Sequence, residues 1–389
     1  MSDSFFFWIM RLLFSCAELG MGHVSRIIPL GKRLEKRGHE LFFFSGGLAY
    51  QLLKKEFKNV HVCTPVAWYE NAHGINTSAS LLNILIPLPY LHHEKGRLEI
   101  KSPIGVETMH RYYDLREHIR KIKPDLIVSD GDMHALRLAH RWKFPSVYIT
   151  NIIRPSCDFS PILIPGERFT ERYVKKCSEI IIPDNPPPYT ICEYNLGDLG
   201  KMGITDKVKF VGSFLDMTPT EGSEEHVFAP ISGPPGTRAK LTGTITAVFK
   251  RLETKSIISL GVLGKKISTR IGNCEIHTWL SPQERQEYMK NSKMIVFSGG
   301  HGTCLETIKY VKPTICIPTQ SEQVGNARKM QDMDCSIVVG NREQLRLAIK
   351  KIADREQFYK NNVKVLNQHS NELKGLENAI AVIEDTAKV

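Results

Sequence analysis

Two groups of residues in this chain have types and spacings suited to chemistry on a phosphate-bearing compound. The first is the glycine-rich stretch Ser298–Thr303, which stands between a short apolar strand and a predicted helix that carries Glu306. Glycines let a backbone approach a diphosphate closely, and the first N–H groups of a helix bind anions. The candidate ligand-binding residues of this stretch are Ser298, Gly300, His301, Gly302 and Thr303.

Three polar side chains follow the next predicted strand. We expect Thr319–Val324 to form a loop and Gly325 or Asn326 to open a helix. Glu322 and Gln323 offer hydrogen-bond acceptors and donors to a hydroxyl-rich ring, and Asn326 could cap the helix or reach a phosphate. Glu306, in the preceding helix, is suited to accept hydrogen bonds from ribose hydroxyls. Together with the glycine stretch, these residues predict a site for a nucleoside diphosphate that carries a sugar.

The second group lies near the start of the chain, at Gly20-Met21-Gly22-His23. This turn follows the first predicted strand, and His23 begins the helix after it. An imidazole, with an ordinary pKa near ~6.5, is suited to take a proton from a hydroxyl at neutral pH. The alternative is that His23 caps the helix and binds a phosphate of the acceptor without moving a proton.

Two carboxylates, Asp130 and Asp132, follow a buried strand at the same predicted sheet edge as His23. A histidine base needs a carboxylate that fixes its tautomer and stabilises its cation, and Asp130 is our first choice for it. Asp132 could contact the acceptor. The two also spell D-x-D, a metal-binding motif of the GT-A glycosyltransferase fold, but the surrounding sheet pattern does not favour that interpretation.

Alternating strand and helix patterns predict the elements that position these residues. The predicted strands of the first half are Met10–Cys16, His39–Ser45, Val60–Thr64, Pro124–Asp130, Pro145–Thr150 and Glu179–Pro183. Its predicted helices are Gly20–Arg37 (with its leading turn), Gly47–Glu56, Pro103–Ile122 and Met133–Trp142. Such alternation is typical of an α/β protein with a parallel sheet covered on both faces.

The second half repeats the same architecture. Its predicted strands are Ser256–Leu260, Cys274–Trp279, Met294–Phe297 and Pro313–Pro318, after an opening strand and loop at Phe228–Arg238. A helix is predicted at Thr237–Leu252, and Val208–Phe214 contains a Val-Gly step at which we place the change of domain. We therefore expect a first domain at 1–207, a linker at 208–222, a second domain at 223–365 and a final helix at 366–389; the resemblance described below implies that the first binds the acceptor and the second the donor.

Bulk composition limits the function classes. The net charge of +11 and the pI near 9.1 are compatible with nucleic acid, an anionic membrane or anionic substrates. Basic residues are spread along the chain without an RNA-binding motif, so we expect no nucleic-acid partner. Nine single cysteines without metal-ligand spacing indicate a reducing cytoplasm. The apolar start has neither a signal-peptide layout nor the length of a membrane span, and residues 1–9 are expected to be an upstream extension.

The glycine turn with Glu306, Pro318 and Glu322-Gln323-x-x-Asn326-Ala327 resembles the donor half of GT-B glycosyltransferases, and G-x-G-H at Gly20–His23 adds to the likeness. The motifs are most similar to MurG-like enzymes, and the plant-type UDP-glycosyltransferases are more distant. In the latter a phosphate-binding histidine stands eight residues before the ribose-binding glutamate; here that position is Ser298.

The resemblance implies two Rossmann-like domains with a central cleft and a C-terminal helix that returns to the N-terminal domain. It also implies a UDP-sugar-dependent hexosyltransferase that inverts the anomeric centre, needs no metal or other cofactor, and uses His23 as general base with Asp130 behind it. Gly20, Gly22 and Asp132 would line the acceptor side.

Two further regions are candidates for the donor side. The loop from Gly233 to Arg238 would face the cleft, where Arg238 could offset charge on the leaving diphosphate; the alternative is a solvated loop arginine. Trp279, with Ser281-Pro282-Gln283, is similar to the W-x-P-Q segment that holds the base in plant-type enzymes. One extra residue intervenes here, so a buried core tryptophan is the alternative.

Leu81–Leu91 is an apolar stretch followed directly by His92, His93, Lys95 and Arg97. An apolar segment edged by cations suits an anionic bilayer or a lipid-linked acceptor, and the alternative is a buried element. We therefore expect a cytoplasmic enzyme associated peripherally with the membrane, with a lipid-linked or small-molecule acceptor.

Two rival functions share the donor site. A UDP-sugar 2-epimerase would need further acid–base residues that the sequence does not offer. A non-catalytic subunit that binds nucleotide sugars is disfavoured by His23 and the donor motif in one chain.

Overall fold

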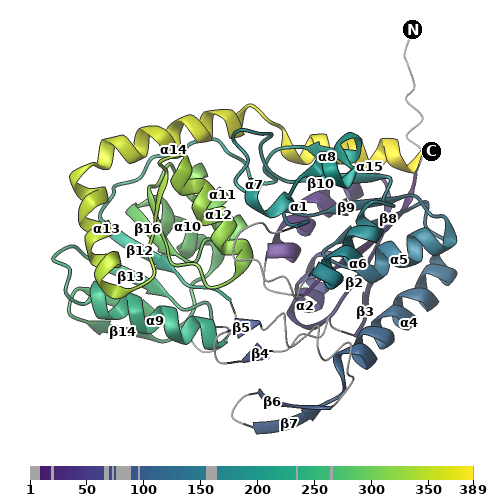
Figure 1. The fold of residues 1–389 in the computed structure, drawn as a ribbon, viewed down its shortest axis with the longest axis horizontal. Helices are drawn as coiled ribbons and strands as arrows, with labels where there is room; N and C mark the ends of the chain where they lie inside the picture. Colours follow the sequence, from purple (N-terminus) through teal and green to yellow (C-terminus); the bar gives the residue numbers. More distant parts are fainter. Residues whose placement is uncertain are drawn as a thin grey trace.

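The computed structural model describes residues 9–18, 22–64, 70–71, 74–75, 89–94, 97–154, 164–233, 235–262 and 266–388. Two α/β domains follow one another along the chain, each built on a seven-stranded sheet with helices on both faces (Figure 1). This is the architecture that the alternating sequence pattern predicts. Within the described ranges, no helix is both long and apolar enough to cross a membrane.

The N-terminal sheet is parallel, in the order β11-β10-β9-β8-β1-β2-β3. Its strands are β1 (Arg11–Cys16), β2 (Glu40–Ser45), β3 (Val60–Val62), β8 (Leu126–Asp130), β9 (Ser146–Ile149), β10 (Glu179–Ile182) and β11 (Val208–Phe210). The helices are α1 (Gly22–Lys36), α2 (Gly47–Glu56), α4 (Ile104–Ile122), α5 (Met133–Trp142), α6 (Ile164–Val174), α7 (Glu193–Leu196), α8 (Leu199–Met202) and the 3₁₀ turn η2 (Thr205–Lys207). Because all strands run the same way, their carboxyl ends meet at one edge.

The second sheet runs β14-β15-β13-β12-β16-β17-β18 and is parallel except for the β14–β15 pair. Its strands are β12 (His226–Pro230), β13 (Ser256–Ser259), β14 (Ser268–Ile271), β15 (Cys274–His277), β16 (Ser292–Phe297), β17 (Thr314–Cys316) and β18 (Ser336–Val338). Its helices are α9 (Pro235–Phe249), α10 (Pro282–Lys290), α11 (His301–Lys309), α12 (Ser321–Asp332) and α13 (Arg342–Asp354). The edge strand β14 and the helix α10 were not predicted from the sequence.

The segment 208–222, expected to be a linker, begins with a strand. Val208–Phe210 forms β11, which pairs with β10 at the edge of the first sheet. A β-branched and aromatic V-x-F triplet is compatible with either a strand or a connection, and only the neighbouring strand selects between them. The connection between the sheets therefore starts after Phe210.

The chain returns to its first domain at the end. α14 (Glu356–Asn371) packs on the second domain, where Val363 and Leu366 join its core. α15 (Gly375–Ala387) places Ala379, Ile380 and Ile383 in the core of the first sheet. The expected crossing of the final helix is confirmed, although the crossing element starts at Gly375.

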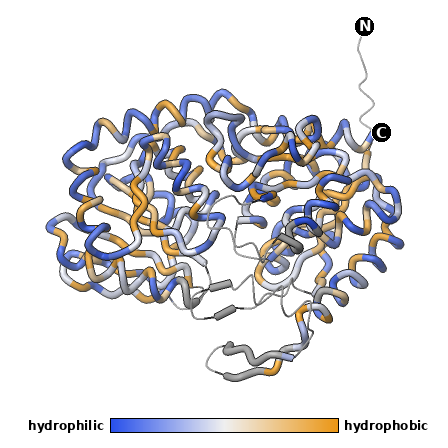
Figure 2. Tube along the Cα trace, in the orientation of Figure 1, coloured by the Kyte–Doolittle hydropathy of each residue, from blue (hydrophilic) through white to orange (hydrophobic). Residues whose placement is uncertain are grey.

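Hydropathy follows these layers, with apolar strands inside both domains and polar residues along the outer helices (Figure 2). The eight described cysteines are buried and form no disulfide, so they act as small apolar core residues. Two small hairpins, β4 (Glu70–Asn71) with β5 (Gly74–Ile75) and β6 (Tyr90–Glu94) with β7 (Arg97–Lys101), extend from the first domain. Residues 81–88 of the apolar stretch lie outside the described residues, and Tyr90 and Leu91 belong to β6.

Candidate active site

The carboxyl ends of β1, β8 and β9 bring the proposed acceptor-side residues together. β8 ends at Asp130, directly beside Cys16 at the end of β1. Gly22 and His23 begin α1, the helix that follows β1. Gly20 lies outside the described residues. Ligands of parallel α/β sheets bind at such strand ends, so this edge is where an acceptor site is expected.

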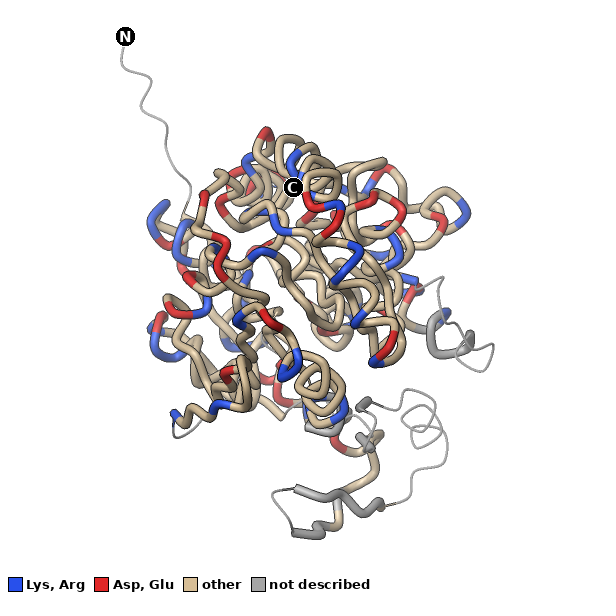
Figure 3. The backbone as a smooth tube through the Cα atoms, turned by 90° about the vertical axis from the view of Figure 1, so that its left-hand side faces the viewer, with Lys and Arg blue, Asp and Glu red and all other residues tan. Residues whose placement is uncertain are grey.

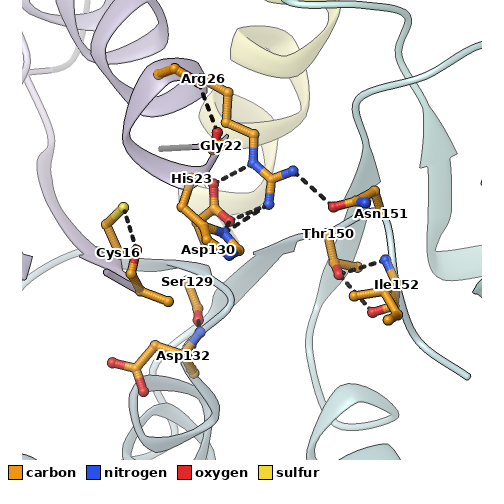
Figure 4. Close-up of polar contacts among 12 residues, drawn as sticks. Cys16, Gly22, His23, Arg26, Ser129, Asp130, Asp132, Thr150, Asn151 and Ile152 are labelled. Carbon is orange, nitrogen blue, oxygen red and sulfur yellow. Dashed lines mark hydrogen bonds and ion pairs between the residues drawn. The ribbon is translucent and has the colours of Figure 1, made fainter. Parts of the chain in front are cut away.

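His23 and Asp130 form a hydrogen-bonded pair, as the sequence predicts (Figure 4). The distance from His23 Nδ1 to Asp130 Oδ1 is 2.6 Å. Burial alone would raise the pKa of Asp130, but the charges and hydrogen bonds of Arg26 and His23 hold it below its ordinary value. An ionised carboxylate only accepts hydrogen bonds, so in a neutral imidazole this contact favours the tautomer with the proton on Nδ1 and the acceptor at Nε2.

Gly131 makes room for this histidine. Its φ of +73° lies in the left-handed region, and a Cβ there would be 2.8 Å from Cε1 of His23. A larger residue at position 131 would therefore both strain the backbone and displace the imidazole of His23. The D-G-D turn at 130–132 is thus shaped around the His23 ring.

Arg26, which sequence reasoning missed, holds the same carboxylate. Its Nε donates to Asp130 Oδ2 at 2.6 Å, and its Nη2 contacts Oδ1 more closely still. Its Nη1 donates to Asn151 Oδ1 at 3.1 Å, after the end of β9 (Figure 4). A spacing of three residues puts Arg26 on the same helix face as His23, and this spacing is the signal that could have found it.

Asp132 is buried and engaged by residues of the first domain. Its carboxylate is fully buried; it caps α5 by accepting from His134 N and receives Arg111 Nε at 3.0 Å. Burial alone would raise its pKa, but Arg111 and the other donors lower it. The acceptor contact expected of Asp132 stays a prediction. The two carboxylates of the D-x-D motif bind different arginines, Arg26 and Arg111.

In the second domain, the glycine stretch leads from β16 into α11. Gly300 is the N-cap of α11, so His301, Gly302 and Thr303 form its first turn. Gly299 has φ +90°, and a Cβ there would be 2.8 Å from the carbonyl oxygen of Gln323. The turn thus presents helix N–H groups at a strand end, which is the geometry that anion binding requires. Ser298 is buried at the end of β16.

The side chain of His301 contacts the first domain. It is buried, and its Nε2 lies 3.3 Å from Oδ2 of Asp184, which belongs to the first domain. Asp184 also accepts from Thr190 Oγ1 and from the backbone of Ile191 and Cys192. This contact joins the start of the donor-side helix to the N-terminal domain.

Glu306 is paired with an arginine that the sequence did not single out. Arg285 of α10 contacts Glu306 Oε1 through Nη1 and lies 3.4 Å from Thr303 Oγ1 through Nη2. The Glu306 carboxylate keeps partial exposure, with 24% of its side chain accessible. A cation therefore lies beside the proposed ribose and diphosphate positions.

The helix α12 starts earlier than expected, at Ser321, so only Thr319 and Gln320 of the predicted loop lie outside it. Gln323 Oε1 accepts from the N–H and hydroxyl of Thr319, which ties this loop to the first turn of the helix. Glu322 and Gln323 accordingly sit in the first turn of α12. Asn326 lies inside the helix, fully buried, where it donates to Gly299 O at 3.0 Å; it does not cap α12, whose N-cap is Gln320, and its phosphate contact stays a prediction.

Polar contacts across the domain boundary connect the two halves of the site. Glu322 Oε1 accepts from Asn151 Nδ2 at 2.7 Å. Asn195 Nδ2 donates to Glu322 O at 2.9 Å and to Asn326 Oδ1 at 2.8 Å. The Glu322 carboxylate, which we expect to bind the donor sugar, is thus connected through Asn151 and Arg26 to the His23–Asp130 pair.

The remaining donor-side candidates lie on other strand ends. Gly233 has φ +105° in the loop after β12, and Arg238 in α9 donates through Nη1 to Gly261 O at 2.9 Å. Trp279 follows β15 and is half-buried. The roles of Arg238 and Trp279 in donor binding stay predictions.

The chain is similar to glycosyltransferases in sequence. The glycosyltransferase family 28 C-terminal domain matches residues 275–379. An uncharacterized glycosyltransferase of Methanosarcina acetivorans is 25% identical over 94% of this chain and 95% of its own length. The UDP-N-acetylglucosamine–N-acetylmuramyl-(pentapeptide) pyrophosphoryl-undecaprenol N-acetylglucosamine transferase of Clostridium tetani is 21% identical over 93% of this chain and 94% of its own length.

Solved structures share the fold. The glycosyltransferase of kitacinnamycin has a TM-score of 0.70 at 15% identity, over 97% of this chain and 99% of that one. The Streptomyces sp. SF2575 glycosyltransferase SsfS6, complexed with thymidine diphosphate, has a TM-score of 0.63 at 16% identity, over 97% and 99%. These likenesses identify the chain as a glycosyltransferase with the GT-B fold.

Proposed function

We propose that this glycosyltransferase moves a sugar from a UDP-sugar to a hydroxyl group of a lipid-linked acceptor, with inversion at the anomeric carbon and without a metal ion. The observation that carries the proposal is the His23–Asp130 pair at the strand ends of the first domain. Nδ1 of His23 is engaged by the carboxylate, and Nε2 remains to accept a proton. UDP as the nucleotide and inversion come from the resemblance to MurG-like enzymes.

In the proposed reaction, His23 Nε2 takes the proton of the acceptor hydroxyl while that oxygen attacks the anomeric carbon. The bond from this carbon to the diphosphate oxygen breaks, and UDP leaves. Asp130 stabilises the imidazolium that forms, and Arg26 fixes the orientation of the carboxylate. General-base catalysis of this kind contributes roughly 10²–10⁴-fold in rate.

The N-terminus of α11 would stabilise the negative charge that develops on the leaving diphosphate. The N–H groups of its first turn have no acceptor within the helix and carry the positive end of its dipole. Arg285, which is ion-paired with Glu306 and lies near Thr303, adds guanidinium N–H donors next to them. Since amides and an arginine can perform this task, the proposal requires no divalent cation.

A ligand screen followed by an assay tests this function. Nucleotide sugars are ranked by thermal stabilisation of the protein, and the best binder is assayed for transfer to a lipid extract in EDTA. We expect UDP-sugars to rank first and transfer to persist in EDTA. Strict dependence on Mg²⁺ or Mn²⁺ would contradict the metal-independent mechanism, and interconversion of UDP-N-acetylglucosamine without acceptor would favour the epimerase.

A further inference from the structure

Asn151 lies where the two domains meet, and its side chain contacts both halves of the candidate site. It follows the end of β9, and only 7% of the residue is exposed. Its Nδ2 donates to Glu322 Oε1 at 2.7 Å, and its Oδ1 accepts from Arg26 Nη1 at 3.1 Å. An arginine only donates and an ionised carboxylate only accepts, so this orientation of the amide satisfies both partners.

The turn that carries Asn151 is fixed by hydrogen bonds on both sides. Directly before Asn151, Thr150 Oγ1 accepts from Ile152 N at 3.1 Å and donates to Ile152 O at 2.7 Å (Figure 4). After it, the N–H group of Ile153 donates to Asn195 O at 2.9 Å. The first domain therefore determines where the Asn151 side chain lies.

Asn195 also fixes the start of α12 against the first domain. Its side chain is inaccessible, and its Nδ2 donates to Glu322 O at 2.9 Å and to Asn326 Oδ1 at 2.8 Å. A Cβ at Gly325 would overlap with Asn195 Oδ1, so α12 approaches this residue closely. Because Asn195 O also binds the turn of Asn151, one residue fixes the backbones of Asn151 and Glu322 relative to each other.

The contact with Asn151 leaves part of the Glu322 carboxylate available to a ligand. Oε1 accepts from Asn151, whereas Oε2 has no hydrogen-bond partner among the residues that the structure describes. A carboxylate has about four lone-pair positions, so several stay open to sugar hydroxyl groups. Asn151 therefore orients Glu322 without saturating it.

Arg26 connects Asn151 to the proposed base. Its Nε and Nη2 both bind the carboxylate of Asp130, which in turn binds His23 Nδ1. Its third nitrogen, Nη1, donates to Asn151. The guanidinium is rigid and planar, so a shift of the Asn151 contact would rotate the whole group. Asn151 therefore contributes to the orientation of the carboxylate that fixes His23.

Buried contacts of this kind position side chains better than surface ion pairs do. Lys, Arg, Asp and Glu are interspersed over the outer elements of both domains (Figure 3). Exposed pairs contribute little, because water and salt screen them. Here the Asp130 side chain is inaccessible and that of Arg26 is 13% exposed. Since misplacement by about 1 Å can lower a rate by about 10²-fold, the contacts of Asn151 are expected to affect transfer.

We propose that Asn151 is a positioning residue of the transfer reaction, which aligns the carboxylate that binds the donor sugar with the arginine that orients the base. This inference rests on the proposed function and deepens it, since it gives a residue of the first domain a role in the use of the donor sugar. Asn151 neither gives nor takes a proton. It brings the anomeric carbon and the acceptor hydroxyl into line across the domain boundary.

Two replacements separate the two contacts of Asn151. Asn151→Asp keeps an acceptor for Arg26 but places a negative charge against Glu322, whereas Asn151→Ala removes both contacts. Transfer to the lipid extract is measured at varied concentrations of the UDP-sugar that ranks first in the ligand screen. We expect Asn151→Asp to raise the KM for this UDP-sugar about tenfold or more, with kcat within about threefold of the wild type. Asn151→Ala should also lower kcat about tenfold or more.

Thermal shifts measure binding apart from transfer. The extra stabilisation that the UDP-sugar gives over UDP should fall in Asn151→Asp, while stabilisation by UDP stays at the wild-type value. Asn361→Ala, at an exposed position of α14, is the control and should change neither the kinetics nor the shifts.

Three results would overturn the inference. One is a wild-type kcat in Asn151→Ala, and another is an equal loss of kcat in Asn151→Asp and Asn151→Ala. The third is an unchanged extra stabilisation by the UDP-sugar in Asn151→Asp. Absence of transfer by the wild type would instead contradict the proposed function, and the thermal shifts would still test the contact with Glu322.

Discussion

The buried carboxylate of Asp130 binds two side chains, His23 and Arg26. A carboxylate with full burial is stable in its charged form only when cations and donors surround it. Here the arginine supplies a permanent charge and contacts both oxygens, and the histidine shares Oδ1 with it. The imidazole is therefore fixed in one tautomer and one orientation before any substrate arrives.

Gly131→Ala tests this arrangement without touching a reacting group. The added Cβ would fall 2.8 Å from His23 Cε1, at a backbone φ of +73°. We expect a loss of roughly 1–2 kcal/mol in the free energy of unfolding from the left-handed backbone and at least a tenfold fall in the transfer rate. Thermal stabilisation by UDP should persist, because the donor half is unaffected.

Gly243→Ala is the matched control. It lies inside α9, and a Cβ there meets nothing within 4 Å. We expect this variant to gain about 0.5–1 kcal/mol of stability and to keep its activity. Equal activity of Gly131→Ala and the wild type would show that the placement of His23 does not depend on this turn.

At the scale of elements, both halves of the site follow one rule: a buried parallel strand ends, and a helix begins with its N–H groups facing the ligand. β1 leads to α1, and β16 leads to α11. α12 repeats the pattern after β17, with Glu322 in its first turn. The sequence suggested a later start for α12, and the earlier one puts Glu322 on a rigid element rather than a loop.

Glu322→Gln tests the role of that turn. Replacement of a charged acceptor by a neutral amide removes a charge-assisted hydrogen bond, worth about 1.5–3 kcal/mol, to the donor sugar. We expect the KM for the UDP-sugar to rise by roughly tenfold or more, with UDP binding changed less than twofold. Glu343→Gln, an exposed position on α13, serves as control and should change neither quantity. A parallel loss of UDP affinity in Glu322→Gln would assign the carboxylate to the nucleotide instead.

Sequence periodicity and turn residues were sufficient to predict most strands and helices of both sheets, as well as the His23–Asp130 pair. Local signals are strong there, because buried parallel strands are apolar throughout. Asn151 and Asp184 were not predicted because their partners, Glu322 and His301, lie in the other domain: Asp184 and His301 are 117 residues apart. Only the packing of two domains brings such residues together, and no local pattern encodes it.

At the scale of the whole molecule, the domains are joined by buried polar contacts as well as by the returning helix α15. Asp184–His301 is a buried contact of this kind, with the carboxylate fully inaccessible. Burial alone would raise the pKa of Asp184, but the hydrogen bond and charge of His301, with the surrounding donors, lower it. The start of α11 is thus anchored to the N-terminal domain.

Asp184→Asn should show this anchor as a pH-dependent loss of stability. A lowered pKa in the folded state means that the ionised carboxylate stabilises the fold above its unfolded pKa, near ~3.9, and that this contribution is lost as the pH falls through the folded value. At pH 7 we expect the free energy of unfolding of the variant, measured in urea, to be roughly 2–3 kcal/mol lower than that of the wild type, because the backbone donors around residue 184 lose a charged acceptor.

The difference between the wild type and Asp184→Asn should shrink as the pH falls below about 4. Asp385→Asn, at an exposed surface ion pair with Lys388, is the control and should cost less than about 0.5 kcal/mol at any pH. A difference for Asp184→Asn that does not change with pH would contradict the assigned ionisation.

The central claim is that His23 is the base of a transfer reaction whose donor is held by the other domain. Its most direct measurement compares transfer rate and UDP stabilisation in the wild type and in His23→Ala, with the same UDP-sugar and lipid acceptor in EDTA. The account predicts a rate lower by about 10²–10⁴-fold in His23→Ala, with an unchanged thermal shift by UDP. Full transfer by His23→Ala would contradict it.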